Sequence, residues 1–308
     1  MKVFPWTVDE NWICDRIVEE WNTFNSLEST KNIEEANVMW ILSGWAWKYI
    51  HPDILSNKKI ALTVHHIVPE KFNQDKLSDF KDRDRFIDLY HVPCKKTKIF
   101  IEKLTQKPIR VIPYWVNPKL WSFYDDKEDL KRRYKLPKDK VIIGSFQKDT
   151  EGSNLITPKL EKGPDIFCDI VESLKTKPHV ILSGWRRQYV ISRLEKANIT
   201  YSYFEMADLK KLNELYNCLD FYLVTSRHEG GPQAILEATL TKTPILSTDV
   251  GIAEYVLNKK CILENKNQFC DFIENKKYSF LQENYDNCLE LSVQNSVQKY
   301  SQMFKEIL

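Results

Sequence analysis

Short apolar runs alternate with amphipathic segments along most of the chain. Each run is short enough for a buried strand, and each segment repeats apolar residues every three to four positions, as a helix with one inner face does. Strand, helix and strand in succession indicate a parallel sheet with helices packed on it. The sequence therefore predicts an α/β protein. The predicted strands are residues 2–6, 38–42, 60–64, 87–92, 109–112, 141–146, 179–183, 200–204, 219–224 and 261–263.

A chain of 308 residues is long enough for two domains, each with its own core. We place the boundary near Asn117, before the charged run 125–140, which gives an N-terminal domain of 1–117 and a C-terminal domain of 118–308. The last predicted helix, about 285–308, either crosses back to the first domain or packs on the second. Its apolar stripe is Leu289, Val293, Val297, Tyr300 and Phe304.

Composition excludes several classes of protein. The net charge of +2 gives no footprint for nucleic acid, and the seven cysteines are scattered without a Cys-x-x-Cys pair, which argues for a reducing compartment and against zinc. The N-terminus lacks the features of a signal peptide, and no apolar run approaches the ~20 residues that span a bilayer. We expect a cytoplasmic protein, with peripheral contact to the inner face of a membrane through the N-terminal domain left open.

The stretch from Thr225 to Glu237 follows an apolar run and leads into a helical pattern. Gly230 and Gly231 let backbone amides approach a ligand, and Pro232 suits the first turn of a helix. Bare N–H groups at a helix start attract phosphate or sugar oxygens. Two carboxylates, Glu229 and Glu237, frame this loop, so the stretch is a candidate binding site.

This segment resembles the donor-site signature, Glu-x7-Glu, of retaining glycosyltransferases of family 4. The continuation from Thr243 to Glu254 is similar to the same family, and the likeness covers Gly144 to Glu254 well but the first domain loosely. The resemblance implies the GT-B fold, two Rossmann-like, doubly wound parallel-sheet domains facing across a cleft. It also implies a hexosyltransferase that moves a sugar from a nucleotide-diphosphate sugar, UDP- or GDP-linked, to a hydroxyl of a glycan or glycolipid acceptor. Configuration is retained, and neither a metal nor a cofactor is needed.

The resemblance also assigns roles to residues. Glu237 is expected to bind the ribose hydroxyls and Glu229 the hydroxyls of the donor sugar, in a pocket shaped by Gly230, Gly231 and Pro232. Thr63-Val64-His65 resembles the strand-end histidine of the family, which meets the donor sugar, and His66 is the weaker candidate.

A departing diphosphate needs fixed positive charge nearby. Lys162-Gly163 looks like the Lys-Gly pair of the family, but the family arginine is missing, because Gly144 is followed by Ser145. Three residues near the carboxyl ends of strands are candidates for the second charge: Lys148, which we favour, then Arg186, and Arg187 beside it. The long loop 147–161 either folds over the donor or is a tolerated insertion.

Eight of the nine tryptophans lie in the first 121 residues, and we expect most of them in the core. Trp12, Trp45 and Trp47 could instead form a stacking surface for a sugar acceptor. The loop from Thr7 to Asn11 takes the place of the acceptor-facing loop of GT-B enzymes but has no glycine, which leaves acceptor contacts open. Asp82-Arg83-Asp84 precedes a predicted strand and is an unsuitable place for a metal-diphosphate site.

Two other functions compete with transfer: a nucleotide-sugar epimerase on the same scaffold, and a non-catalytic nucleotide-sugar-binding protein. The departure at Ser145 favours the binder. The intact set of Lys162, Glu229, Gly230, Gly231 and Glu237 favours an enzyme. Slow hydrolysis of the donor would separate enzyme from binder.

Overall fold

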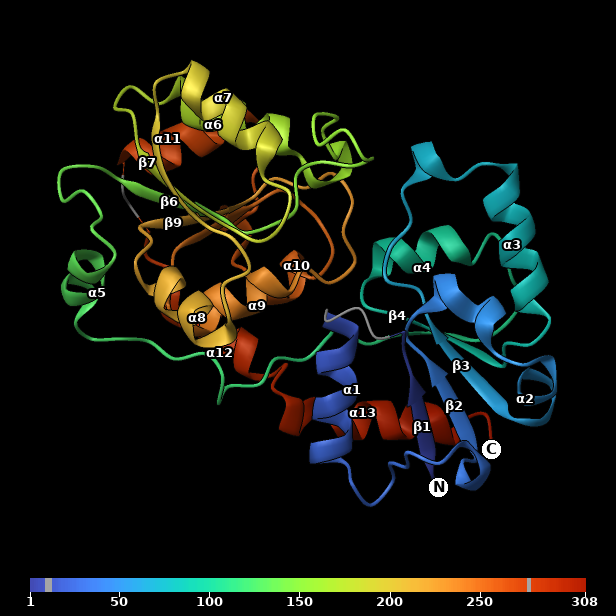
Figure 1. The fold of residues 1–308 in the computed structure, drawn as a ribbon. Helices are drawn as coiled ribbons and strands as arrows, with labels where there is room; N and C mark the ends of the chain where they lie inside the picture. Colours follow the sequence, from blue (N-terminus) through green and yellow to red (C-terminus); the bar gives the residue numbers. More distant parts are fainter. Residues whose placement is uncertain (9–12, 276–277) are drawn as a thin grey trace. The chain divides into compact units, whose positions relative to one another are not determined.

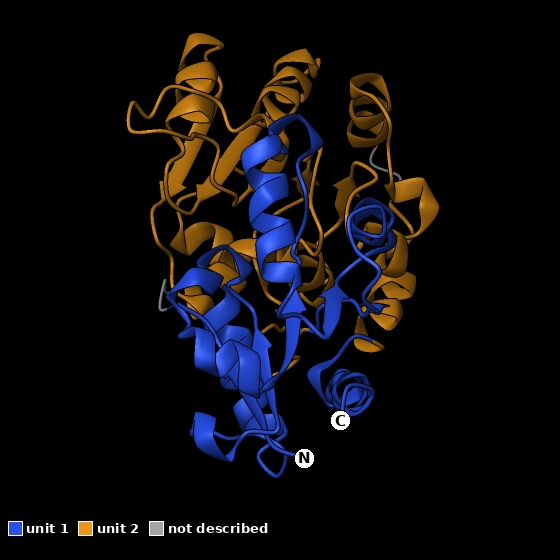
Figure 2. Cartoon of the chain, turned by 90° about the vertical axis from the view of Figure 1, so that its right-hand side faces the viewer, with its two compact units in different colours: residues 1–115, 291–308 blue, residues 116–290 orange. Residues whose placement is uncertain are grey.

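The computed structural model describes residues 1–8, 13–275 and 278–308, which form two compact units. Unit 1 comprises Met1–Trp115 and Leu291–Leu308, and unit 2 comprises Val116–Glu290 (Figure 2). Each unit has its own five-stranded parallel sheet. The predicted α/β class, with two Rossmann-like domains, is confirmed.

The sheet of unit 1 has its strands in chain order (Figure 1). They are β1 (Val3–Trp6), β2 (Val38–Ile41), β3 (Lys59–Thr63), β4 (Leu89–Val92) and β5 (Ile109–Val111). After helix α1 (Ile13–Phe24) the chain returns along the free edge of β1, where Val3 and Ser29 form a parallel bridge, before it reaches β2. β1 therefore has the segment at Ser29 on one side and β2 on the other. The chain adds first to one edge of β1 and then to the opposite edge, so the order of the segments reverses at β1.

Successive residues of β2 point to opposite faces of the sheet, which divides the core of unit 1 in two. Trp40 packs with α1 and α13 (Val293–Lys305), while Met39 packs on the other side. That side is covered by η2 (Gly44–Tyr49), α2 (Pro52–Asn57), α3 (Gln74–Asp84) and α4 (Lys95–Ile101). Asp82 and Asp84 thus lie at the end of a helix, where Asp84 accepts hydrogen bonds from Tyr90 and Thr105.

Helix α13 completes unit 1 although it follows unit 2 in the sequence. The rings of Tyr300 and Phe304 each lie 5.3 Å from the ring of Trp40, and Trp115 lies 4.8 Å from Tyr300. Aromatic pairs at such distances stabilise a core by about 0.5–1.5 kcal/mol beyond their buried area. Aromatic packing thus holds the C-terminal helix on the first sheet.

The sheet of unit 2 has the order β10-β9-β6-β7-β8. The strands are β6 (Ile142–Ser145), β7 (His179–Ser183), β8 (Thr200–Phe204), β9 (Phe221–Val224) and β10 (Ile245–Ser247). The chain builds outward from β6 to β8 and then returns to add β9 on the other side of β6. Ligands of open parallel sheets bind where the order reverses, beyond the carboxyl ends of the strands. In unit 2 this switch point lies between β6 and β9.

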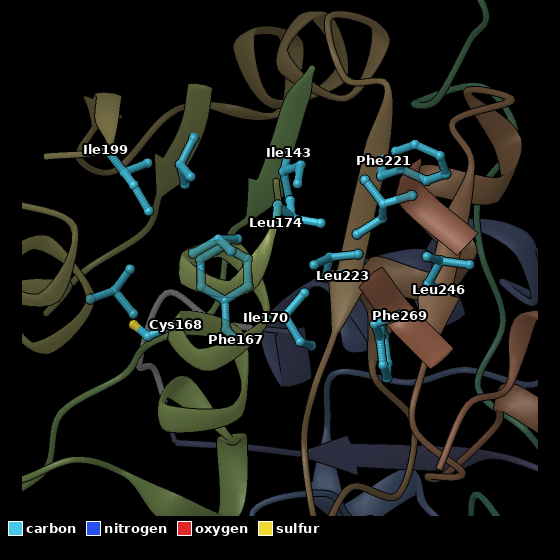
Figure 3. Packing of buried hydrophobic residues seen from close by; sticks show 14 of the residues in the cluster. Ile143, Phe167, Cys168, Ile170, Leu174, Ile199, Phe221, Leu223, Leu246 and Phe269 are labelled. Carbon is cyan, nitrogen blue, oxygen red and sulfur yellow. The ribbon is translucent and has the colours of Figure 1, made fainter. Parts of the chain in front are cut away.

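Helices cover both faces of the second sheet (Figure 1). One face holds α6 (Pro164–Ser173), α7 (Gln188–Lys196) and α11 (Lys266–Asn275), and the other α8 (Leu209–Asn217), α9 (Gln233–Leu240), α10 (Ala253–Val256) and α12 (Leu281–Leu289). In Figure 3, Phe167 and Ile170 of α6 lie with Leu223 and Leu246 in one buried cluster. A further helix, α5 (Lys127–Arg133), lies in the charged run. No helix in the described part of the chain is long and apolar enough to cross a membrane.

The predicted strand at 261–263 is wrong. The chain forms a 3-10 turn, η5 (Lys259–Cys261), and pairs with β10 only through a single bridge between Ser247 and Ile262. Leu263 N–H donates to Ser247 C=O at 2.7 Å. The run is apolar because Cys261 and Leu263 are buried. Buried residues are apolar in a turn as well as in a strand, so the pattern did not distinguish the two.

Acidification should weaken unit 1 through His91, which is buried between Thr63 and Ile112. Burial lowers its pKa from 6.5 to about 4. The unfolded chain therefore takes up a proton near pH 6.5 that the folded chain refuses. Stability is complete above pH 6.5 and falls as the pH drops toward 4, by about 3 kcal/mol. Urea unfolding followed by tryptophan fluorescence measures this loss.

The control for this prediction is a second histidine of unit 1. His91→Gln should flatten the dependence on pH, whereas His51→Gln, at an exposed position, should keep the slope of the wild type. An unchanged slope in His91→Gln would show that other groups cause the acid sensitivity.

Candidate functional site

Two loops leave the sheet side by side at the switch point of unit 2. Gly144 pairs with Tyr222 across β6 and β9, so the segments after Ser145 and Val224 start next to each other. Gly144 packs closely against Leu219: a Cβ there would lie 2.3 Å from Cδ1 of Leu219, so that side chain would have to shift. The predicted residues Gly144 and Ser145 thus lie at the base of the site.

Lys162 and Glu229 form an ion pair above this base. Lys162 is the last residue of the turn η4 (Leu160–Lys162), and Glu229 lies in the loop after β9. Lys162 Nζ is 2.6 Å from Glu229 Oε1, and the side chains are 16% and 10% exposed. A charge-assisted bond of this length is among the strong hydrogen bonds of proteins. The tertiary structure therefore joins the two predicted catalytic residues.

Ser226 and Gln147 hold this pair in place. The Ser226 hydroxyl lies 3.3 Å from both Glu229 Oε1 and Gln147 Oε1, and Gln147 Nε2 donates to Lys162 C=O at 2.8 Å. Our sequence reasoning did not single out either residue. The signal was available, because each is a polar residue within two positions of the carboxyl end of a strand that borders the switch point.

Gly163 allows the Lys162 turn to approach the loop after β9. Its φ is +61°, and a Cβ would lie 1.8 Å from Thr225 C=O. The Thr225 hydroxyl in turn donates to Gly163 C=O at 2.8 Å. A side chain at position 163 would push the two backbones apart and separate Lys162 from Glu229.

Gly163→Ala should therefore destabilise unit 2 by more than about 3 kcal/mol, since the clash adds to the roughly 1–2 kcal/mol of a left-handed alanine. Gly152→Ala is the matched control. Its φ is +68°, but the nearest atom lies 3.9 Å from the added Cβ. Thermal unfolding of both variants separates backbone strain from the clash, and equal losses would contradict the close approach.

Glu237 lies on α9 and is buried. The Tyr216 hydroxyl donates to its Oε2 at 3.0 Å, and the ring of Phe146 packs 4.8 Å from that of Tyr216. Phe146 follows β6 directly, so an aromatic contact connects Glu237 to the switch point. Tyr216 was missed at the sequence level because its partner comes from a different helix.

The glycine loop before α9 is held by the next loop of the sheet. A Cβ on Gly251 would lie 2.4 Å from Gly230 C=O and 2.8 Å from Cδ of Pro232. Pro232 is the N-cap of α9, one position before the first turn that the sequence suggested for it. Gly231 is partly exposed next to it. Gly230, Gly231 and Pro232 thus form one braced segment beside Glu229.

Arg187 is not available as the second cation. It is fully buried, with Nε 3.0 Å from Asp149 Oδ2, and it donates to Ser145 C=O at 2.8 Å and to Ser145 Oγ at 3.0 Å. Arg186 has a φ of +64° and donates to Gly152 C=O. Lys148 lies over the ring of Trp185, with its Nζ 4.9 Å from the centroid.

The predicted histidines lie in unit 1, after β3. His65 Nδ1 is 2.5 Å from the Tyr114 hydroxyl and its Nε2 is 2.8 Å from Leu42 C=O, so contacts within unit 1 orient the ring. The Tyr114 hydroxyl donates and the Nε2–H donates in the tautomer that satisfies both. His66 is partly exposed beside it.

Of the two described tryptophans that were proposed as a stacking surface, Trp45 is exposed and Trp47 is not. Trp45 is 49% exposed and lies 5.7 Å from the ring of His65. Trp47 is buried and donates to Asp79, so its prediction is wrong: its indole fills the core beneath η2. Trp12, and the loop from Thr7 to Asn11 beyond its second residue, lie outside the described residues.

The two parallel-sheet units define the GT-B fold, which solved glycosyltransferases share. HepE from Anabaena, solved in complex with UDP-glucose, superposes with a TM-score of 0.80 at 12% identity, over 99% of each chain. Sucrose-phosphate synthase from Thermosynechococcus elongatus gives 0.72 at 15% identity, over 95% of this chain and 77% of the other.

Sequence comparison points to the same class. The model of the family "Glycosyl transferases group 1" matches residues 153–275, which contain Lys162, Glu229 and Glu237. A probable sucrose-phosphate synthase of Thermosipho melanesiensis is 27% identical over 64% of this chain, and the mannosyltransferase LpsB of Rhizobium meliloti, for lipopolysaccharide core biosynthesis, is 25% identical over 47%. The alignments span 42% and 41% of those relatives, about two fifths of their length.

Proposed function

We propose that the protein is a retaining glycosyltransferase of family 4, which moves a sugar from a nucleoside diphosphate to an acceptor hydroxyl without a metal. The observation that carries this proposal is the Lys162–Glu229 pair at the switch point of the second sheet, 2.6 Å between charged atoms. The match of residues 153–275 to a glycosyltransferase family supports it.

The chemistry divides between the two charges. Lys162 stabilises the leaving diphosphate. The negative charge of the diphosphate grows in the transition state, and a fixed cation stabilises it. Glu229 is the acceptor for hydroxyls of the donor sugar. The carboxylate orients the sugar while the departing phosphate guides attack on the same face, so the anomeric configuration is retained.

Glu237, with Tyr216 beside it, is the proposed binding site for the ribose of the donor. The buried carboxylate of Glu237 accepts a hydrogen bond from Tyr216, and a carboxylate suits the two hydroxyls of a ribose as a bidentate acceptor. The structure of HepE is a complex with UDP-glucose, which makes UDP sugars the first donors to test.

A thermal-shift screen of UDP, GDP, ADP, CMP and their sugars tests the donor site. A ligand at a hundred times its dissociation constant adds about 2.7 kcal/mol of stability. We expect one nucleotide class to stabilise the wild type, Glu237→Ala to lose the response, and Glu264→Ala, an exposed carboxylate of unit 2, to keep it. A wild type that responds to none of these ligands would contradict the proposal.

Product analysis tests the reaction itself. With the donor identified by the screen, we expect slow release of free sugar in water, with the α or β configuration of the donor preserved in the initial product by NMR. Chelator treatment should leave the rate unchanged. An inverted anomer would refute retention, an epimerised donor would indicate an epimerase, and an intact donor would indicate a binder.

A further inference from the structure

The loop 147–161 folds back on itself as a narrow hairpin. Lys159 N–H donates to Asp149 C=O at 2.8 Å, Thr150 and Pro158 form an antiparallel bridge, and Glu151 N–H donates to Thr157 C=O at 3.0 Å. These three contacts join residues 149–151 to residues 157–159. Lys148 and Lys159 leave the hairpin at the same end.

The base of this hairpin is anchored in the core of unit 2. Asp149 and Thr150 are buried, Asp149 N–H donates to Arg186 C=O at 3.1 Å, and the carboxylate of Asp149 pairs with buried Arg187. Arg187 also binds Ser145 at the end of β6. The hairpin base therefore has a fixed position relative to the switch point.

Three ammonium groups gather where the hairpin ends. Lys159 lies one turn before Lys162, whose N–H donates to Lys159 C=O at 2.8 Å. Burial, followed by the charges of Lys162 and Lys148, lowers the pKa of Lys159, and burial and Arg186 lower the pKa of Lys148. Like charges held together in a partly dry place are stabilised by a bound anion.

The carboxylates nearby offset part of this charge: Glu161 and Glu229 act on Lys159, and Glu151 and Glu161 act on Lys148. Glu161 Oε1 lies 3.8 Å from Lys159 Nζ, at the outer limit of an ion pair, and Glu229 is paired with Lys162. Within the described residues, the ammonium groups of Lys148 and Lys159 donate no hydrogen bond, and Lys148 Nζ lies 4.9 Å from the centroid of the Trp185 ring. The N–H groups of both ammonium groups can therefore donate hydrogen bonds to a bound anion.

We propose that Lys159, with Lys148, supplies the positive charge for the donor diphosphate that Ser145 cannot supply, and that the hairpin 147–161 exists to present it. This inference rests on the proposed function and names the residues that serve the same site. Lys159 is a new assignment. It is not among the residues that match the family near Gly144, because the fold-back of the loop, and not its position in the sequence, places it at this site.

Calorimetric binding of inorganic pyrophosphate and of the nucleoside diphosphate identified by the thermal-shift screen tests the proposal. We expect Lys159→Ala to weaken both by about tenfold or more, the loss typical of one charged hydrogen bond. Lys159→Arg should keep most of the affinity, and Lys210→Ala, an exposed lysine of α8, should match the wild type. The parent nucleoside, which lacks phosphate, should bind all four proteins equally.

Each outcome separates this proposal from the broader one. Equal binding of pyrophosphate and nucleoside diphosphate by Lys159→Ala and the wild type overturns the role of Lys159 and leaves the transferase intact. Binding of pyrophosphate that depends on Lys159, without binding of any nucleoside diphosphate, supports the anion site and overturns the transferase. A wild type that binds neither overturns both. Circular dichroism confirms that each variant is folded.

Discussion

Replacing Lys162 with methionine is expected to lower the turnover number for sugar release by about a hundred- to a thousandfold. Removal of one preorganised donor to a developing negative charge has effects of that size. The ammonium lies 2.6 Å from Glu229 and is largely enclosed, so water that enters in its place does not restore the lost electrostatic stabilisation. The hydrolysis rate of the donor, measured at saturation, checks this expectation.

The control addresses the carboxylate that this variant leaves behind. Lys162→Met deprives Glu229 of its partner, and a largely buried carboxylate without one is costly. The double variant Lys162→Met with Glu229→Gln removes that charge, so it should regain thermal stability and stay inactive. If Lys162→Met raises only KM and leaves kcat within tenfold, the lysine binds substrate and transition state equally and the catalytic role is wrong.

Arg187→Met is expected to destabilise unit 2 by about 3–5 kcal/mol, because it leaves Asp149 buried without its ion-pair partner. The guanidinium is fully buried and also binds Ser145 and Ser183, so the loss removes several hydrogen bonds at once. Urea unfolding followed by circular dichroism measures the change in the free energy of unfolding.

Arg193 is the matched control for burial. It donates to Glu172 and Asp169 on α6 with bonds of 2.7–2.8 Å, yet its side chain is 28% exposed. Arg193→Met should therefore cost under about 1 kcal/mol, as solvated ion pairs do. The pair Arg187→Met with Asp149→Leu should regain part of the loss. Equal effects at the two arginines would contradict burial as the cause.

Local pattern was sufficient for most of the secondary structure and for part of the site. The strands at 179–183 and 200–204 agree with the predicted bounds. The first of them is buried along its whole length, and parallel strands buried on both faces leave nearly continuous apolar runs. The Lys162-Gly163 pair was identified by its likeness to the Lys-Gly pair of the family, and the structure shows that Gly163 has a left-handed φ.

Local sequence patterns did not predict the ion pairs and hydrogen bonds between segments that are distant in the chain. Arg186 and Arg187 are adjacent and look equivalent in the sequence, yet one is fully buried against Asp149 and the other donates to Gly152. Which of two neighbouring arginines turns inward depends on the packing of the loop after β7. Lys159 was missed because the fold-back of the loop, and no periodic pattern, places it beside Asp149.

The sequence by itself determined the α/β class, the strand–loop–helix segment around Glu229 and Glu237, and the likeness to a sugar-transfer family, because periodicity, glycines and residue spacing are local properties. Only the tertiary structure decided that Lys162 meets Glu229, that Tyr216 holds Glu237 and that α13 packs on Trp40. Those contacts join residues far apart in the chain, and they form only when burial of the two cores fixes the elements that carry them.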